Sequence, residues 1–269
     1  MVNSAYQSHT ALHCDDTSSS QVDRNVAIET AVAISINGTT HAVMMCSPTD
    51  LRDFAIGFAL TEGIITALDQ IESLEFIEHA TGIEAQFWLA EDSARPFLAR
   101  RRAMAGPVGC GLCGIDSLEQ AVRPLPVVPT TQVDFDPVHI GMATDRLRDL
   151  QPLHDKTHAV HAAGFMDETG QIIVAREDVG RHNALDKVIG ALACAANPAA
   201  SGAIVLTSRV SVEMVQKTAM IGAPMIVAVS APTSHALELA HTANITLCAR
   251  AHGGEFDCYT HPFRLKGHR

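Results

Sequence analysis

The sequence predicts an α/β protein, α+β overall, in which a small N-terminal α+β domain precedes a larger domain with helices packed on the faces of a sheet. In the second half of the chain, short apolar runs of strand length alternate with amphipathic helical segments, an order typical of a helix-covered sheet. In the first half, a strand–turn–strand pattern precedes a single helix. Between the halves, Pro124, Pro126 and Pro129 predict an extended connector and a domain boundary.

The composition is that of a globular protein and argues against two kinds of partner, nucleic acid and membrane. The chain has 269 residues, of which 47% are apolar, enough for one large domain or two modest ones. Its formal net charge is −11, whereas binding to nucleic acid or to a membrane surface requires a basic face. No apolar run approaches the roughly 20 residues of a membrane span. We therefore expect neither nucleic acid nor membrane as a partner.

Residues 1–24 are predicted to be a disordered leader. They are rich in Ser, Thr and Asp, and they lack both the basic and the apolar region of a signal peptide. The seven cysteines of the chain have irregular spacings, unlike those of a disulfide-bonded secreted domain. We expect a cytoplasmic protein with reduced thiols.

Residues 25–130 are predicted to form the small α+β domain. Asn37-Gly38 is a strong hairpin signal between two strands, and Ser47 or Thr49 is expected to cap the helix that follows. The predicted elements are strands over 26–36 and 39–46, a helix that begins within 47–50 and ends near Gly63, and strands over 74–78 and 84–89.

Residues 131–269 are predicted to form the larger α/β domain. Its runs over 203–207 and 225–229 are continuously apolar, as buried parallel strands usually are. On a strand over 157–165, His158 and His161 would face opposite sides. The other predicted elements are a helix over 139–150, a strand over 171–175, helices over 181–196, 211–221 and 234–242, and strands over 245–249 and 256–259.

Cys110-Gly111-Leu112-Cys113 is the CxxC pair of the sequence and the first candidate for chemistry. The spacing brings two sulfurs close together, the flanking glycines would leave them accessible, and cations such as Arg100–Arg102 would favour the reactive thiolate. The same pair could instead be half of a zinc site, which needs two more ligands. Further ligands are available, although no second pair has zinc-ribbon spacing: His154, His158, His161, Cys248 and Cys258. A reactive thiol and a zinc site both stay open.

Polar loops that follow the predicted strands of the α/β domain are the second candidate. Ligands of open α/β sheets bind beyond the carboxyl ends of the strands, and helix N-termini favour anions. The loops therefore predict a site for a phosphate-bearing ligand, although several of these residues could equally be plain helix caps. The candidates are Asp178, Arg181, His182 and Asn183 in the first loop, Ser208 and Arg209 in the second, and Ser230 and Thr233 in the third.

Four segments in a fixed order carry a resemblance to a known family: GCGLCG, REDVGRHNALDKVIG, SRVSVEMVQKTAMIGAP and VAVSAPTSHALELA. Together they resemble the FdhD/NarQ family of formate dehydrogenase accessory sulfurtransferases, over about residues 25 to 263. The resemblance implies a cytidine deaminase-like α/β/α fold for the C-terminal domain, and a homodimer. The cysteine ligands of deaminase zinc chemistry are absent from the predicted helix starts, which disfavours deamination.

The resemblance further implies an enzyme that accepts sulfur from a cysteine desulfurase as a persulfide. It would pass that sulfur to the molybdenum cofactor, Mo-bis(molybdopterin guanine dinucleotide), bound as a substrate and destined for formate dehydrogenase. Cys110 would carry the persulfide and Cys113 would assist, with no metal belonging to the protein itself. Two other functions stay open: a chaperone that binds the cofactor without covalent sulfur chemistry, and a zinc-stabilised regulatory module.

The C-terminal loops, by the same resemblance, would hold the guanine nucleotide ends of the cofactor. His252 and Glu255 stand where arginines are common in the family, which weakens a simple phosphate clamp, and Arg250 is available to compensate. The segment expected to bind the cofactor comprises Cys248, Ala249, Arg250, Ala251, His252 and Gly253.

Overall fold

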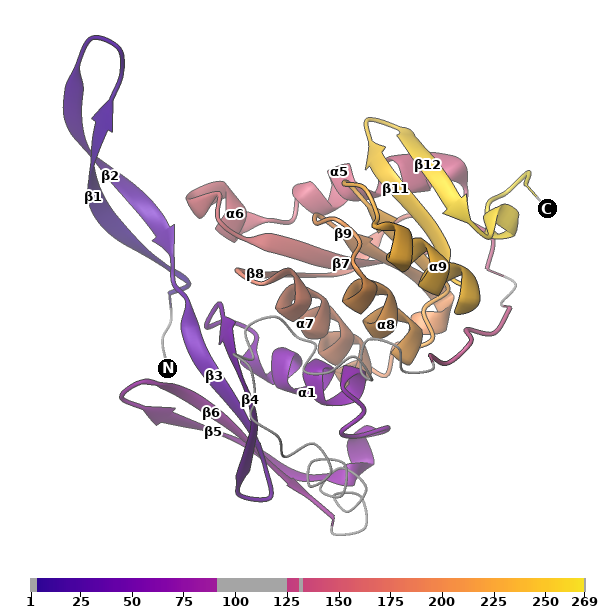
Figure 1. Ribbon diagram of the computed structural model, residues 1–269, viewed down its shortest axis with the longest axis horizontal. Helices are drawn as coiled ribbons and strands as arrows, with labels where there is room; N and C mark the ends of the chain where they lie inside the picture. The colour runs from indigo at the N-terminus through magenta and orange to yellow at the C-terminus, as the bar shows by residue number, and fades with distance from the viewer. Residues whose placement is uncertain (1–3, 91–124, 131–132, 269) are drawn as a thin grey trace.

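The computed structural model describes residues 4–90, 125–130 and 133–268. Figure 1 shows a large sheet covered by helices, a smaller sheet beyond one of the helix layers, and a hairpin that extends away from both. This mixed α/β architecture confirms the predicted fold class. Cys110 and Cys113 lie outside the described residues.

The larger sheet has six strands in the order β12-β11-β10-β9-β7-β8. Their bounds are β7 (His161–Asp167), β8 (Ile172–Asp178), β9 (Gly202–Leu206), β10 (Met225–Ala228), β11 (Thr246–His252) and β12 (Glu255–Thr260). The three strands β9, β10 and β11 are parallel to one another, whereas β7, β8 and β12 pair antiparallel with their neighbours. The parallel strands give the sheet a common carboxyl edge, where loops from all three meet.

Helices cover both faces of this sheet. One layer comprises α7 (Arg181–Cys194), α8 (Val212–Met220) and α9 (Ser234–Thr242), and the other α4 (Pro137–Gly141) and α5 (Ala143–Arg148), followed by α6 (Pro152–Thr157). Within β9, Ile204 and Leu206 point into the first layer, and Ala203 and Val205 into the second. Because both faces are covered, β9 and β10 are buried throughout, as their continuous apolar sequences predict.

The smaller sheet has the order β4-β3-β6-β5 and packs on one helix, α1 (Leu51–Thr61). Its strands are β3 (Thr30–Ile36), β4 (Thr39–Cys46), β5 (Ile71–His79) and β6 (Gly82–Leu89). Asn37 and Gly38 both have positive φ, 47° and 76°, as the predicted two-residue hairpin requires. The expected cap is wrong: α1 begins after Asp50, whose side chain makes no capping bond.

Two glycines bring the backbones of α1 and α7 into direct contact. A Cβ atom on Gly57 would lie 1.8 Å from the Asp186 carbonyl oxygen, and one on Gly190 would lie 1.9 Å from the Asp53 carbonyl oxygen. No side chain fits at either position without separating the helices. The crossing therefore fixes the small sheet and α1 against the larger domain.

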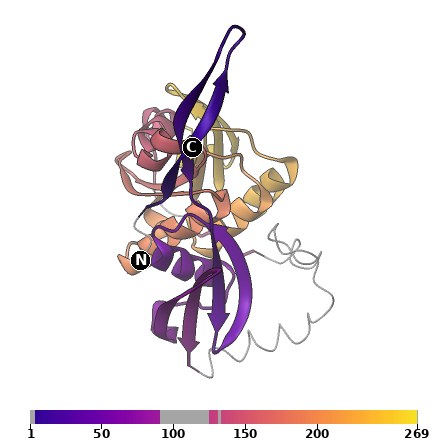
Figure 2. The ribbon, with the colours of Figure 1, turned by 90° about the vertical axis from the view of Figure 1, so that its left-hand side faces the viewer.

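The predicted disordered leader is wrong, because residues 6–27 form an antiparallel hairpin of β1 (Tyr6–Cys14) and β2 (Ser19–Ala27). Figures 1 and 2 show this hairpin extending beyond the rest of the protein. The Lys156 ammonium lies 4.7 Å from the centre of the Tyr6 ring, so α6 contacts the base of the hairpin. Since nearly all its side chains are exposed, the hairpin lacks the apolar alternation by which a strand is normally identified.

Two predicted elements of the larger domain differ from the structure. The helix over 139–150 is divided between α4 and α5 at Met142. The strand expected from residue 157 begins only at His161, because α6 extends to Thr157 and His158 ends it with a left-handed φ of 53°. A short 3₁₀ turn also lies at each of three places, Leu68–Gln70, Ala199–Ser201 and Pro262–Arg264. Within the described ranges, no helix is long and apolar enough to cross a membrane.

Candidate functional site

A cavity of about 500 Å³ opens at the carboxyl edge of the larger sheet. Thr207 and Val229, which directly follow β9 and β10, line the cavity on the side of the sheet. Residues of α5 and α6 and at the start of β7 line the rest of it. This is the edge at which open α/β sheets bind their ligands. The lining residues are Thr144, Asp145, Arg148, Gln151, His154, His158, Ala159, Val160, His161, Thr207 and Val229.

Three histidines gather in this cavity although they come from different elements. The Glu177 carboxylate accepts hydrogen bonds from the backbone N–H groups of Leu153 and His154, both at 2.8 Å, and so fixes the first turn of α6. His154 Nδ1 lies 3.1 Å from the Val160 carbonyl oxygen. The expectation that His158 and His161 face opposite sides of a strand is wrong, because His158 ends a helix and both residues line the cavity.

The cavity wall at His161 is electropositive. Burial lowers the pKa of His161, and the neighbouring Arg181, His182 and His154 lower it further, against an opposing effect of the Asp178 carboxylate. In the described part of the chain, Arg181 Nε is buried and has no hydrogen-bond partner, and the buried His182 Nε2 lies 3.7 Å from the Glu213 carboxylate. Both residues neighbour His161, and neither is among the residues that line the cavity itself. An unsatisfied buried guanidinium donor beside a histidine whose pKa is lowered indicates a place for an anion near this wall.

The predicted polar loops lie side by side at the same edge of the sheet. The Val210 N–H donates to the Ala231 carbonyl at 3.3 Å, and the Arg250 N–H donates to the Ser230 carbonyl at 3.4 Å. The loops after β9 and β10 and the end of β11 therefore meet, as the sequence predicts. Thr233 caps α9 by accepting from the Ala236 N–H, so the plain helix-cap interpretation is confirmed for this residue.

The other predicted loop residues differ in how far their side chains are exposed to solvent. The Ser208 side chain is buried and donates to the Arg209 carbonyl, whereas Arg209, Ser230 and Arg250 are exposed at the edge. Arg250 Nη1 lies 3.8 Å from the Asp257 carboxylate, so its positive charge already has an acidic neighbour.

The segment from Arg250 to Gly253 is attached to two residues of the cavity wall. The Thr144 hydroxyl donates to the Ala251 carbonyl, and the Gly253 N–H donates to the Asp145 carboxylate at 2.7 Å. Cys248, Ala249 and Ala251 are buried in the sheet, whereas His252 and Gly253 are exposed at the turn into β12. The predicted cofactor-binding segment therefore adjoins the cavity, and its first residues serve as part of the core.

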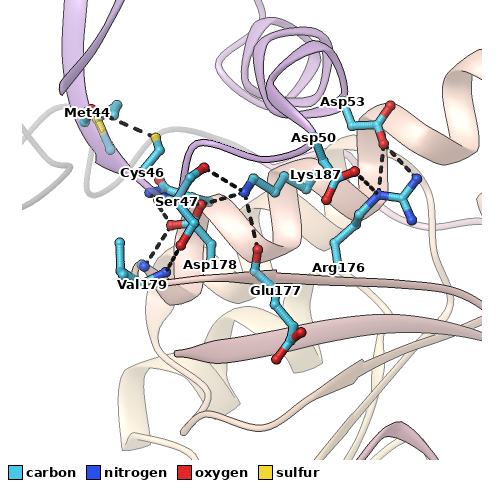
Figure 3. Close-up of polar contacts among 12 residues, drawn as sticks. Met44, Cys46, Ser47, Asp50, Asp53, Arg176, Glu177, Asp178, Val179 and Lys187 are labelled. Atoms are coloured by element: carbon cyan, nitrogen blue, oxygen red, sulfur yellow. Dashed lines mark hydrogen bonds and ion pairs between the residues drawn. The ribbon is translucent and has the colours of Figure 1, made fainter. Parts of the chain in front are cut away.

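Asp178 and Asn183 are placed differently from the other predicted site residues. The Asp178 carboxylate is fully buried and pairs with Lys187 at 2.7 Å (Figure 3). It also accepts from the N–H groups of Ser47 and Gly180 and from the Asn183 amide. Asn183 donates a second bond to the Met45 carbonyl. With each carboxylate oxygen held by two donors, Asp178 joins the small domain to the start of α7 rather than facing the cavity.

The same junction contains two further polar links. The Ser47 hydroxyl accepts from the Val179 N–H at 3.1 Å, and the Ser47 carbonyl accepts from the Lys187 ammonium at 3.1 Å. Nearby, the Arg176 guanidinium pairs with Asp53 at 2.7 Å, as Figure 3 also shows. These contacts position the loop from Val179 to Arg181, which leads to the electropositive wall.

The sequence reasoning selected the loops around the cavity and missed most of the residues that line it, naming His154, His158 and His161 only as possible zinc ligands. Thr207 and Val229 each lie one position before a predicted loop residue, so the strand ends were identified to within one residue. Thr144 and Asp145 lie on α5 and Gln151 directly precedes α6, and the sequence held no chemical signal for these three residues. Among the residues that the structure describes, no group of three His, Cys, Asp or Glu side chains could hold a metal ion.

Comparisons with known proteins agree with this architecture. The FdhD/NarQ family model matches residues 27–266. Proteins named sulfur carrier protein FdhD from Agrobacterium fabrum and Brucella abortus are 49% and 51% identical, each covering 90% of both chains. A crystal structure from Desulfotalea psychrophila, described as a formate dehydrogenase accessory protein, aligns with a TM-score of 0.75 and 25% identity over 97% of this chain and 100% of that one. The chain therefore belongs to the FdhD/NarQ family.

Proposed function

We propose that this protein is a sulfurtransferase that serves formate dehydrogenase by sulfurating its molybdenum cofactor. The Cys110 thiolate would attack the terminal sulfur of a cysteine desulfurase persulfide. The donor's S–S bond breaks, its cysteine leaves as a thiolate, and a new S–S bond forms at Cys110. Cys113 would assist, and the sulfur would then pass to Mo-bis(molybdopterin guanine dinucleotide), the bound substrate. The names of the relatives, sulfur carrier and formate dehydrogenase accessory proteins, support this role.

The electropositive cavity wall is the observation that favours a nucleotide-bearing substrate. Each guanine nucleotide end of the cofactor carries phosphates, and Arg181, which neighbours His161, offers a buried guanidinium donor that has no partner in the described structure. A cavity of about 500 Å³ lies within the size range of small-molecule sites. The family resemblance leads us to expect a homodimer in the cytoplasm. Such a dimer would present two of these cavities, one to each nucleotide end of the cofactor.

The experiment that tests sulfur transfer is mass measurement of the intact protein after loading. The purified protein is incubated with a cysteine desulfurase and cysteine, and its mass is measured without reductant beside the Cys110→Ala and Cys113→Ala variants. We expect a gain of one sulfur that reductant removes and that Cys110→Ala abolishes. No gain from a donor that loads a positive-control acceptor would contradict the proposal.

A chaperone that holds the cofactor without covalent sulfur chemistry is the second candidate. The cavity favours it, because the described residues that form the electropositive wall include no thiol. Under this alternative, Cys110→Ala would still activate formate dehydrogenase in cells that lack the wild-type protein. Under sulfur transfer, the same variant would leave the dehydrogenase inactive while still binding the nucleotide.

A further inference from the structure

Two cysteines that the proposed function does not use as thiols face each other across a pair of antiparallel strands. Cys248 on β11 and Cys258 on β12 are register partners, next to a register shift between Leu247 and Cys248. Partners in antiparallel strands have Cα atoms about 4.5–5.5 Å apart. That separation falls within the range of about 4.4–6.8 Å in which a disulfide forms without backbone movement.

Both side chains lie on the same face of the sheet. Cys248 belongs to the apolar cluster beneath α4 and α5, and Cys258 packs against that cluster. The Cys258 thiol donates to the Thr260 carbonyl at 3.6 Å, and interaction between the two thiols raises the pKa of Cys248 and lowers that of Cys258. The pair therefore consists of neighbouring sulfurs, and not of two cysteines that merely share a register position.

Exposure makes the two thiols unequal. Cys248 is completely buried, whereas Cys258 is only partly buried and lies on β12, the edge strand of the sheet. A reagent from solution can reach Cys258 and not Cys248. The more accessible thiol is also the one with the lowered pKa, so it is the better nucleophile near neutral pH.

We propose that Cys248 and Cys258 form a reversible disulfide when the protein meets a low-molecular-weight disulfide such as oxidised glutathione. The Cys258 thiolate attacks one sulfur of the reagent, whose S–S bond breaks and releases one glutathione thiol. The Cys248 thiol loses its proton and attacks the Cys258 sulfur, releasing the second glutathione thiol and closing the protein disulfide. Two protein thiols are oxidised, and one glutathione disulfide is reduced to two thiols.

The cross-link would act on the turn between β11 and β12. Residues 250–254 lie between the two cysteines, and Ala251 and Gly253 bind Thr144 and Asp145 of the cavity wall. A disulfide between β11 and β12 next to this turn would restrict how far the turn can move from the cavity wall. This site is independent of Cys110 and of sulfur transfer.

Tryptic mapping of the oxidised full-length protein tests the proposal directly. Trypsin cleaves after Lys217, Arg250 and Arg264, which places Cys248 in peptide 218–250 and Cys258 in peptide 251–264, each with a single cysteine. The reduced protein is exposed to oxidised glutathione, quenched with acid and alkylated before digestion. We expect one species in which the two peptides are joined and together lighter by two hydrogens, and which reductant separates.

Single variants distinguish the two chemical steps. In Cys248→Ala, the second attack is impossible, so Cys258 should retain one glutathione. In Cys258→Ala, the buried Cys248 should stay unmodified. Cys194→Ala is the matched control, because it removes a different exposed cysteine and should leave the joined peptides unchanged.

A time course on the wild-type protein needs no substitution and therefore no assumption about variant folding. Glutathione should appear on Cys258 first and disappear as the joined peptides form. Persistent glutathione on Cys258 in the wild type, or joined peptides that form only after denaturation, would overturn the proposal.

Discussion

Replacing Asp178 by Asn is expected to destabilise the protein by several kcal/mol without changing the shape of the side chain. The carboxylate and the Lys187 ammonium are both fully buried and lie 2.7 Å apart. Asn keeps an oxygen that can accept from the Gly180 N–H, but it removes the negative charge. Lys187 would then be left with the carbonyls of Ser47 and Glu177, at 3.1 and 3.2 Å, as its partners in the described structure.

The magnitude follows from leaving a buried charge without its counter-charge, which costs about 3–5 kcal/mol. This is a large part of the roughly 5–15 kcal/mol by which folded domains are stable. The matched control is Asp155→Asn, which breaks a 2.6 Å pair with Arg148 whose side chains are 60% and 46% exposed. A surface pair of that kind contributes about 0–1 kcal/mol.

The assay is urea unfolding followed by circular dichroism at neutral pH, for the wild type and the single variants Asp178→Asn, Lys187→Met and Asp155→Asn. The double variant, Asp178→Asn with Lys187→Met, removes both charges and should recover part of the loss, because the uncompensated ammonium is gone. A loss below about 1 kcal/mol for Asp178→Asn, matching the surface control, would refute the reasoning. So would a double variant whose loss equals the sum of its two single losses.

Three further predictions concern the helix crossing, the cavity wall and a buried acid. Gly57→Ala should destabilise by about 1–3 kcal/mol in urea unfolding, although alanine ordinarily favours a helix, because its Cβ would meet the Asp186 carbonyl at 1.8 Å. GDP should raise the pKa of His161 in an NMR titration, because a bound anion offsets the positive charges that lower it in the free protein; an unchanged pKa would place the anion elsewhere. The neighbouring His182, whose Nε2 lies 3.7 Å away, and a 2.7 Å hydrogen bond from the Ser211 hydroxyl lower the pKa of Glu213 to about 2 from 4.5. The stability that Glu213 adds over Glu213→Gln should therefore be complete above pH 4.5 and lost as the pH falls toward 2, as urea unfolding across that range would show.

Elements with a strong apolar pattern could be predicted from the sequence, and elements without one could not. The buried strands at 203–207 and 225–229 agree with β9 and β10 to within a residue, because their apolar runs reflect burial on both faces. The N-terminal hairpin was missed because its exposed side chains follow no apolar period. The start of β7 was missed because the left-handed turn at His158 has no glycine to mark it.

The candidate site was predictable at its edge and not in its interior. Strand ends and polar loops are local features, so the sequence placed Ser208, Ser230 and Arg250 at one edge of the sheet. The roles of Asp178 and Asn183 depend on Ser47 and Met45, more than 100 residues away in the chain. Which polar side chain faces a ligand and which joins two domains is a tertiary property that local sequence does not contain.

The cavity is the central structural claim, and titration of GDP by calorimetry tests it most directly. Arg181→Gln removes the cation beside His161, and Arg24→Gln makes the same substitution on the exposed hairpin strand β2 as a control. A charge-assisted hydrogen bond contributes about 1.5–3 kcal/mol, so Arg181→Gln should weaken GDP binding by roughly 10- to 100-fold. The control should bind as the wild type does. Equal affinities for all three proteins, or no binding of GDP to the wild type, would contradict the assignment of this cavity to the nucleotide end of the cofactor.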